Sequence, residues 1–409
     1  MYNISLETMC PTQVSTINQQ KQTIKKTSIP TGVDKVELNT DPLTEKPARM
    51  LVDLLKSALN GEKCDSKELA NATAEDWQNM IKMADYSSIT AIASDGIGEV
   101  GVESIPRDTV FRIAQSQIEA ESVHRSQEMN LKMIQRVLNH YGIETVQLKG
   151  LGLSMLYPNP THRIGCDVDI YTRLKDTTTE SRSNSGDIVD KIMLRAGIKV
   201  EDYDKPKAKH SEFVYNGTNF ENHKFFVNKE KLSQAKMLDE LLHKTLNPQE
   251  TVLPKGTKIL TPSKEFNTIF LAQHALQHYI WGGLNLHHLA DWSMFIRENG
   301  LKLPEETKGT KFEEFTHALT NLSNRFLGTN IPVPENKEYE NELLSKMLHP
   351  EKHSPSPELS KLEILFFKVK RNIKMSQKAK EFGGGNIAKI FFETVLEKIH
   401  DIPALFRPL

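Results

Sequence analysis

Cysteine is scarce in this sequence. Among 409 residues only Cys10, Cys64 and Cys166 carry thiols, and no two of them form a CxxC pair. An odd number of widely spaced cysteines argues against a disulfide framework and against a cysteine zinc site. This usage is typical of a protein from a reducing compartment.

An excess of charge of one sign and long apolar runs are also missing. Lys plus Arg number 52 and Asp plus Glu 53, so the formal net charge is −1. The chain therefore lacks the overall basic field that binds nucleic acid without sequence preference. Its first residues contain no apolar core of signal-peptide length, and no segment has the apolar length of a membrane span. We expect a cytoplasmic protein.

Four segments differ in composition and in the period of their apolar residues. Residues 1–45 are polar and are expected to form a disordered arm, either a dispensable tail or a partner-binding segment. Residues 46–140 have helical spacing and predict a helical lobe. Short β-type runs alternate with helices in 141–230, and 231–409 is helical again. The expected fold is α+β, with a small mixed-sheet core flanked by N- and C-terminal helical lobes.

The α/β segment predicts the order strand, helix, strand, helix, strand, strand. The expected strands are 144–148, 167–171, 210–215 and 220–227, and the expected helices are 152–157 and 187–196. The last two strands are joined by NGTN, in which Asn216-Gly217 is a strong signal for a two-residue hairpin turn.

The main chemical signal is the strand DVDIY. Side chains alternate along a strand, so Asp167 and Asp169 lie on one face while Val168 and Ile170 face the core. Two carboxylates this close repel each other unless a cation lies between them. Mg²⁺ prefers one or two carboxylates together with water and substrate phosphate. A DxD sequence also occurs by chance in surface turns, so the pair predicts a Mg²⁺ site only in combination with other motifs.

A third carboxylate is expected to complete the metal site or to activate the incoming hydroxyl. Glu221 is the candidate, because it opens the strand FENHKFFV and shares a face with His223. Glu212, on the preceding strand, is its rival.

Two further positions are suited to phosphate. Lys149-Gly150 ends the first strand, and a glycine there lets backbone amides approach phosphate oxygens. The helix that follows would point its N-terminus at the same anion. Lys149 would neutralise charge on a triphosphate, and Arg163, four residues before Asp167, would do the same in the transition state.

This combination resembles the polymerase-β-like nucleotidyltransferase superfamily, and more narrowly its bacterial uncharacterised nucleotidyltransferase family. The resemblance spans roughly 46–300 and rests on Leu148-Lys149-Gly150, Tyr157 to Arg163, Asp167-Val168-Asp169-Ile170, Glu221-Asn222-His223, HALQH and LADW. It implies Mg²⁺-dependent transfer of a nucleoside monophosphate from an NTP to an acceptor hydroxyl. The acceptor, whether a small molecule, a sugar, a protein or RNA, is not identified by it.

One feature departs from the superfamily pattern, which usually has Gly-Ser or Gly-Gly at the strand end some ten residues before the acidic pair. Here Gly150 is followed by Leu151, and Asp167 comes 17 residues later (167 − 150). The contacts that this turn makes with the phosphates are therefore expected to differ in detail from those of the superfamily. A non-catalytic nucleotide-binding module on the same fold is the alternative function, favoured if Glu221 lies far from Asp167 and Asp169.

Histidines and a basic segment complete the list of candidates. His274 and His278 lie four residues apart on a predicted helix and share a face. HALQH lacks the glutamate of HExxH zinc enzymes. The two histidines therefore have two interpretations, as polar residues packed at a helix interface or as the centre of a His-based metal hydrolase. Together with His223, the two histidines are candidates for contacts with the acceptor or the cleft.

Residues 361–409 contain 10 Lys/Arg against 5 Asp/Glu. They predict a helical region that could make a weak contact with nucleic acid or a membrane.

Overall fold

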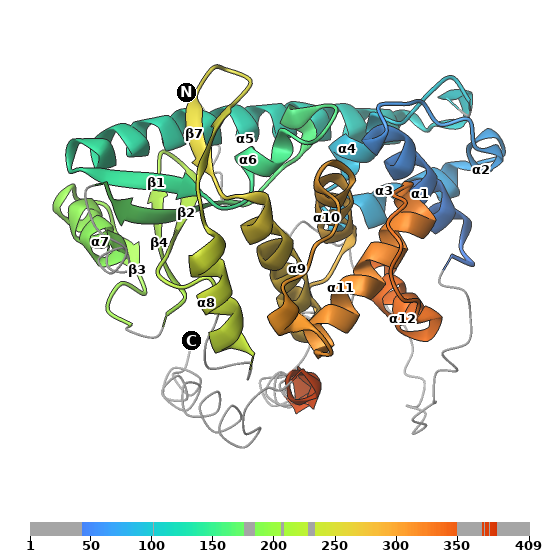
Figure 1. Ribbon diagram of the computed structural model, residues 1–409. Helices are drawn as coiled ribbons and strands as arrows, with labels where there is room; N and C mark the ends of the chain where they lie inside the picture. The colour runs from blue at the N-terminus through green and yellow to red at the C-terminus, as the bar shows by residue number, and fades with distance from the viewer. Residues whose placement is uncertain are drawn as a thin grey trace, which may run out of the picture.

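The computed structural model describes residues 43–100, 102–175, 185–205, 208–227, 234–349, 370–371, 373–375 and 377–382. The expected arm at 1–45 and the basic segment at 361–409 lie almost wholly outside this part of the chain. Helices flank a mixed sheet (Figure 1), which confirms the expected α+β class. Within the described residues, no helix combines the length and the apolar character that crossing a membrane requires.

The first part of the chain is helical. Its elements are α1 (Lys46–Leu59), α2 (Lys67–Ala70), α3 (Ala74–Tyr86), α4 (Thr90–Ser94), the 3₁₀ turn η1 (Val102–Ser104) and α5 (Arg107–His140). Local signals set these boundaries: Ser66 caps α2, and Thr73 forms a capping box with Asp76 at the start of α3. The long helix α5 runs from this helical part across to the sheet (Figure 1).

Within the described residues, seven strands form one sheet in the order β3-β4-β5-β2-β1-β7-β6. They are β1 (Ile143–Gln147), β2 (Asp167–Leu174), β3 (Val200–Glu201), β4 (His210–Tyr215), β5 (Thr218–His223), β6 (Gln249–Val252) and β7 (Lys258–Thr261). The pairs β2–β5 and β1–β7 are parallel, and the other neighbours are antiparallel. Asn216 and Gly217 both have positive φ angles, so the predicted hairpin between β4 and β5 is confirmed.

The hairpin β6–β7 corrects the expectation that the chain is only helical after residue 231. The spacing of apolar residues does not reveal these strands, because they lie toward the sheet edge and bury few side chains. Ile259 is fully buried, and most of their other side chains are partly or wholly exposed. A strand that buries one side chain shows no apolar alternation. The two-residue β3, at the opposite edge, was not predicted for the same reason.

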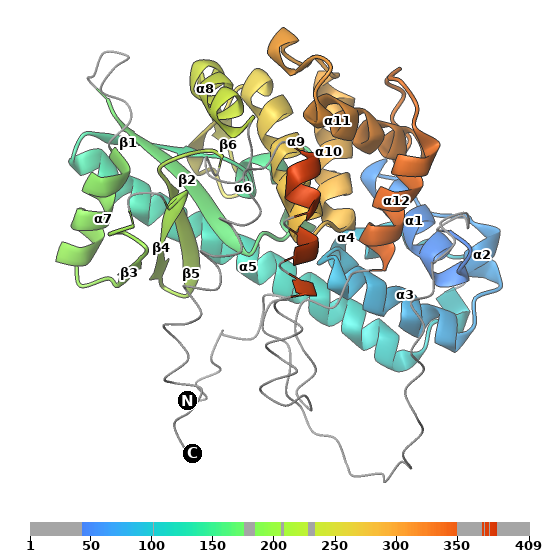
Figure 2. The same cartoon turned by 90° about the horizontal axis from the view of Figure 1, so that it is seen from below.

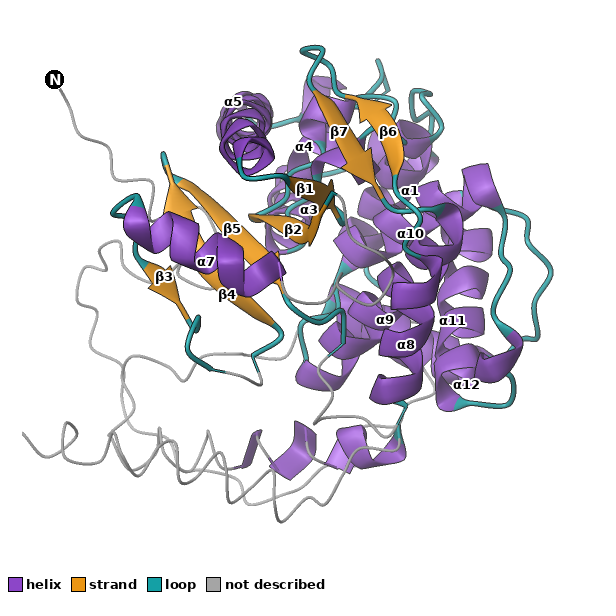
Figure 3. Ribbon diagram, turned by 60° about the vertical axis from the view of Figure 1, so that its left-hand side comes forward, coloured by secondary structure: helices purple, strands orange, loops and turns teal. Residues whose placement is uncertain are grey.

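The two faces of the sheet meet different helices. Val168 and Ile170 of β2 and Phe220 of β5 pack against α5 and α7 (Ser185–Arg195). The opposite face points toward α8 (Ala235–Thr245) and α9 (Lys264–Trp281), which lie on the other side of the sheet from α7 (Figure 3). The expected division of β2 into an apolar core face and a carboxylate face is therefore present.

The helices that precede the sheet in the sequence pack together with those that follow it. The C-terminal elements are α9, α10 (Leu286–Asn299), η4 (Glu305–Thr307), α11 (Lys311–Leu322), η5 (Ser323–Leu327) and α12 (Lys337–Leu348). They share one apolar core with α1 and α3, and Figure 2 shows α1, α3, α11 and α12 together. Arg297 of α10 donates hydrogen bonds to the carbonyls of Leu59 (2.6 Å) and Leu327 (2.8 Å).

The stacked pair Phe213–Phe220 holds β4 and β5 on the layer formed by α5 and α7. Their ring centroids are 5.1 Å apart and both side chains are buried. We expect Phe220→Ala to lower the free energy of unfolding by about 3–5 kcal/mol, because it removes a buried ring and leaves a cavity. Val214→Ala, at an exposed position of the same hairpin, is the control and should cost far less. Urea denaturation followed by circular dichroism measures both, and equal costs would contradict the assignment.

Candidate active site

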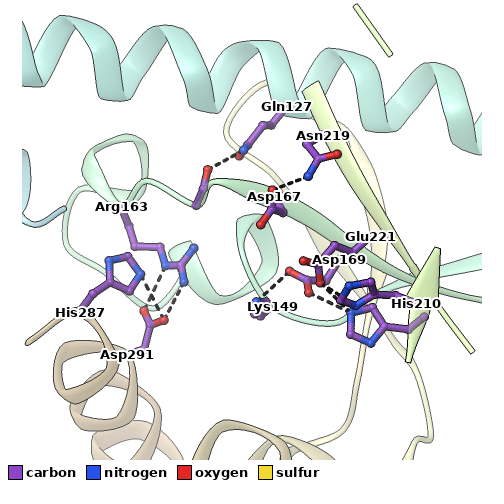
Figure 4. A network of polar contacts seen from close by, with 12 residues as sticks. Gln127, Lys149, Arg163, Asp167, Asp169, His210, Asn219, Glu221, His287 and Asp291 are labelled. Atoms are coloured by element: carbon purple, nitrogen blue, oxygen red, sulfur yellow. Dashed lines mark hydrogen bonds and ion pairs between the residues drawn. The ribbon is translucent and has the colours of Figure 1, made fainter. Parts of the chain in front are cut away.

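Parallel pairing of β2 with β5 brings the predicted carboxylates together. Asp169 lies opposite Glu221, and Asp167 lies opposite Asn219. Glu212 pairs with Glu221 from β4, one strand farther from β2. Glu221 rather than Glu212 is therefore the acidic neighbour of Asp169, and Figure 4 shows Asp167, Asp169 and Glu221 on the same side of the sheet.

Lys149 neutralises part of this negative charge. It follows β1, and its Nζ lies 3.2 Å from Oδ2 of Asp169, which is almost completely buried. Burial by itself lowers the pKa of Lys149, but the charges of Asp169, Glu221 and Asp167 outweigh it and raise that pKa above its ordinary value. Beyond this ion pair, Oδ2 of Asp169 has no hydrogen-bond partner in the described part of the chain.

Two imidazoles fix the carboxylates from the side of β4 and β5. Nε2 of His223 lies 3.0 Å from Asp169 and 3.3 Å from Glu221, and Nδ1 of His210 lies 3.2 Å from Glu221. Burial alone raises the pKa of Glu221, but the hydrogen bond from His223 and the charge of Lys149 hold it well below its usual range. Burial lowers the pKa of His210 to about 4, so this imidazole is neutral at pH 7.

Asp167 has surroundings different from those of Asp169. Its Oδ1 accepts a 2.7 Å hydrogen bond from the side-chain amide of Asn219. Burial raises the pKa of Asp167, and the charges of Glu221 and Asp169 add to this effect against the hydrogen bond from Asn219. Just before it, the carbonyl of Gly165 accepts a 2.7 Å hydrogen bond from Gln127 of α5, which fixes the approach to β2.

The three carboxylates do not converge on one point. Among the described residues, two groups have possible ligand atoms that all lie within 4.8 Å of one another: His210 with Glu221 and His223, and His274 with His278 and His288. Asp167, Asp169 and Glu221 do not form such a group: Asn219 holds Asp167, whereas His223 contacts both Asp169 and Glu221. Their common face and unbalanced charge are still features of a cation site.

The turn after β1 depends on two glycines. Gly150 has a φ of 68°, and a Cβ there would lie 2.8 Å from Nε2 of Gln147; a Cβ on Gly152 would lie 2.5 Å from Thr261. Oε1 of Gln147 accepts a hydrogen bond from the amide of Gly152 (2.7 Å), while its buried Nε2 has no partner among the described residues. The following helix α6 (Leu151–Ser154) has only four residues, so the expected helix-terminal phosphate contact loses its basis.

Arg163 makes a contact that the sequence did not predict. Its guanidinium is buried and forms a two-pronged ion pair with Asp291 of α10, at 3.0 and 2.6 Å. The hydroxyl of Tyr157 donates to the same carboxylate at 2.6 Å, and Nε2 of His287 lies 3.4 Å from it. Triphosphate binding by Arg163 stays a prediction. In the structure, this side chain connects the segment before β2 to α10 (Figure 4).

The same segment has a second anchor. His162, at the end of the 3₁₀ turn η2 (Pro160–His162), places Nδ1 2.9 Å from the carboxylate of Asp95. Burial alone lowers the pKa of His162, but the hydrogen bond to Asp95 and the charges of Asp95 and Glu121 raise it above its ordinary value of 6.5.

The predicted histidines of α9 lie beside this site. His274 and His278 have ring centroids 4.5 Å apart, and His288 of α10 joins them at 5.4 and 4.3 Å. Burial lowers the pKa of all three, that of His278 to about 3, so the rings are neutral at pH 7. The group contains no carboxylate, which argues against the His-based metal hydrolase.

Several of these residues lay beyond sequence reasoning. His210 was within reach, because a hairpin centred on Asn216-Gly217 pairs it with His223. The partner of Asp291 was not, since nothing in the sequence relates this helix to Arg163, 128 residues earlier.

The site lies inside a region that matches a known protein family. A family model described as "Uncharacterised nucleotidyltransferase" matches residues 73–328, from the start of α3 to the end of η5. All strands of the sheet and all residues discussed above from Asp95 onward fall within it. No curated protein and no solved structure matches the chain.

Breaking the Arg163–Asp291 pair should be costly. Arg163→Met or Asp291→Leu alone leaves a buried charge without its partner, and each is expected to lower the free energy of unfolding by about 3–5 kcal/mol. The double variant removes both charges and should cost clearly less than the sum of the two. Urea denaturation of the three variants at neutral pH measures the coupling, and additive costs would show that the pair does not act as a unit.

The His162–Asp95 contact should depend on pH. Because the folded-state pKa of His162 is raised, the contribution of the pair to stability is fully present below about pH 6.5. It is lost as the pH rises through the folded-state pKa. The difference in free energy of unfolding between the wild type and His162→Gln should therefore shrink from pH 5.5 to pH 9, as measured by urea denaturation at several pH values. A difference that grows with pH would reverse the assigned sign.

Proposed function

This chain belongs to the uncharacterised nucleotidyltransferase family, and we propose that it transfers a nucleoside monophosphate from an NTP to an acceptor hydroxyl at the site around Asp169. The observation that supports this most directly is the parallel register of β2 and β5, in which Asp169 and Glu221 lie side by side. Asp167, two residues before Asp169, shares their face.

The donor set fits a Mg²⁺ ion. Oδ2 of Asp169 is buried and lacks a hydrogen bond among the described residues, and neighbouring negative charges help to raise the pKa of Asp167. Both observations describe negative charge that Lys149 alone does not balance. Asp167, Asp169 and Glu221 would hold the ion, which supplies neutralisation of the phosphate charge during transfer.

Glu221 is assigned to the cation site rather than to proton transfer. His210 and His223 both lie within 3.3 Å of its carboxylate, and His223 also contacts Asp169. A general base must reach the hydroxyl that it deprotonates, whereas a ligand benefits from being held in one orientation. His223 therefore positions Glu221 and Asp169 relative to each other.

Lys149 and the turn that follows it are proposed to bind the triphosphate. The ammonium of Lys149 lies beside Asp169 on a flexible four-carbon stem, so it also reaches an anion bound over the carboxylate face. A glycine at position 150 leaves room for Nε2 of Gln147, a buried donor without a partner in the described part of the chain. This donor and the backbone of the turn would supply hydrogen bonds to phosphate oxygens.

The non-catalytic binding module is the weaker alternative. A module that only holds a nucleotide needs a phosphate turn and one charged partner, but it does not need a third acidic residue. Glu221 lies opposite Asp169, and His223 contacts both carboxylates. This arrangement favours transfer over binding alone.

The proposal predicts which carboxylates the reaction requires. Full-length protein is incubated with Mg²⁺, each of four NTPs labelled at the α-phosphate, and a cell extract as the source of acceptor. Label transfer should occur with the wild type, disappear with EDTA, and fall below detection in Asp169→Asn and Glu221→Gln. Lys149→Met should slow it by about 10²- to 10³-fold, because one positive donor to the developing charge is lost.

Glu212→Gln is the matched control, since it changes the same residue type one strand away. Its transfer rate should stay close to that of the wild type. Transfer that persists in Asp169→Asn and Glu221→Gln, or that is lost only in Glu212→Gln, would refute the assignment of the site.

A further inference from the structure

Three histidines gather where α9 ends and α10 begins. Gly282, with a φ of 82°, ends α9, and the amide of Gly283 donates a 2.7 Å hydrogen bond to the carbonyl of His278. This reversal brings His288 of α10 against His274 and His278 of α9. One ring nitrogen from each of the three lies within 4.8 Å of the other two.

The reversal leaves space for the ring of His278. A Cβ on Gly283 would lie 2.9 Å from Nδ1 of that ring, closer than side-chain atoms approach each other. Glycine at 283 therefore lets the imidazole lie against the backbone. In the described part of the chain, the rings of His274 and His278 form no hydrogen bond or ion pair, so nitrogen lone pairs on both rings are available.

The ring of His288 is oriented by a neighbour. Its Nδ1 lies 2.8 Å from Oδ1 of Asn285, and the same oxygen accepts a hydrogen bond from the amide of His287. The backbone amide of Asn285 also donates to Nδ1, at 3.3 Å, so the ring is held through Nδ1 and Nε2 is the nitrogen that can bind a metal. A neighbour that fixes the orientation of an imidazole in this way is a common feature of metal-ligating histidines.

The cluster is separate from the carboxylates but close to them. Phe270 lies between the two groups, with its ring centroid 6.4 Å from that of His223 and 6.4 Å from that of His274. His287, the fourth histidine of this region, contacts Asp291 and is not a member of the cluster.

We propose that His274, His278 and His288 bind a divalent transition-metal ion of the zinc class. Three imidazoles without a carboxylate select Zn²⁺, Co²⁺ or Ni²⁺ over Mg²⁺, which requires oxygen ligands. Zn–N bonds of about 2.1 Å in a tetrahedral site put the nitrogens roughly 3.4 Å apart, so small ring rotations complete the site. Three protein ligands leave one coordination position open. This site goes beyond the proposed transfer reaction and does not depend on it.

The test measures metal binding by the full-length protein. Protein treated with a chelator is dialysed against Zn²⁺ in the presence of excess Mg²⁺, and bound zinc is determined by elemental analysis. The wild type should retain a single Zn²⁺ ion per chain, and Co²⁺ in its place should give the visible absorption of a four-coordinate site. His274→Ala, His278→Ala and His288→Ala should each abolish retention, while the exposed His140→Ala should not.

Two variants separate ligation from folding. Asn285→Ala removes the partner of His288 and should weaken Zn²⁺ affinity by about 10- to 100-fold. Asn285→Asp keeps an acceptor oxygen and the helix cap, so its affinity should stay near that of the wild type. Circular dichroism establishes that each variant is folded, and Zn²⁺ should raise the melting temperature of the wild type but not of His278→Ala.

Two results would overturn the proposal. One is a wild-type protein that retains no Zn²⁺ when Mg²⁺ is in excess. The other is retention that survives in His278→Ala but is lost in His210→Ala or His223→Ala, because the ion would then belong to the group around Glu221. The first result does not bear on nucleotidyl transfer, which is assayed separately; the second would place the ion at Glu221, a residue of the proposed transfer site.

Discussion

Buried negative charge on β2 and β5 is the constraint on which the rest of the site depends. Asp169 is almost fully buried and Glu221 lies beside it, and burying carboxylates without compensation costs several kcal/mol each. The sheet order meets this need, because β1 and β5 flank β2 and β4 lies next to β5. Lys149 from the end of β1 and His223 from β5 can therefore both contact Asp169, and His210 from β4 lies beside Glu221.

The long interval between Gly150 and Asp167 does not separate the phosphate turn from the carboxylates. The amide of Leu148 donates a 3.0 Å hydrogen bond to the carbonyl of Asp169, so the end of β1 lies directly against the acidic stretch of β2. The additional residues form α6, η2 and a loop. Arg163 attaches this loop to α10, and His162 attaches it to Asp95 after α4. The segment between Gly150 and Asp167 is thus fixed to both helical parts.

The sequence predicts what local periodicity and turn chemistry determine. The alternation in DVDIY separates Val168 and Ile170 from the two aspartates, and Asn216-Gly217 sets the register of β4 and β5. The strand pair β6–β7 has no comparable signal, since it buries little more than Ile259. The partnership of Arg163 with Asp291 depends on how the helices fold back on the sheet. No single sequence shows that, so this ion pair was not predicted, and phosphate binding by Arg163 stays a prediction.

The same ion pair connects the two clusters of candidate ligands. Asp291 lies one helical turn after His287 and His288 on α10, and Arg163 lies four residues before Asp167. The start of α10 and the approach to β2 are therefore held by a single buried contact, with Tyr157 as a further donor. Carboxylates on the sheet suit a hard cation and imidazoles on the helices suit a softer one. Asp291 belongs to neither set of ligands, but its contact with Arg163 connects the helix that carries His288 to the segment before Asp167.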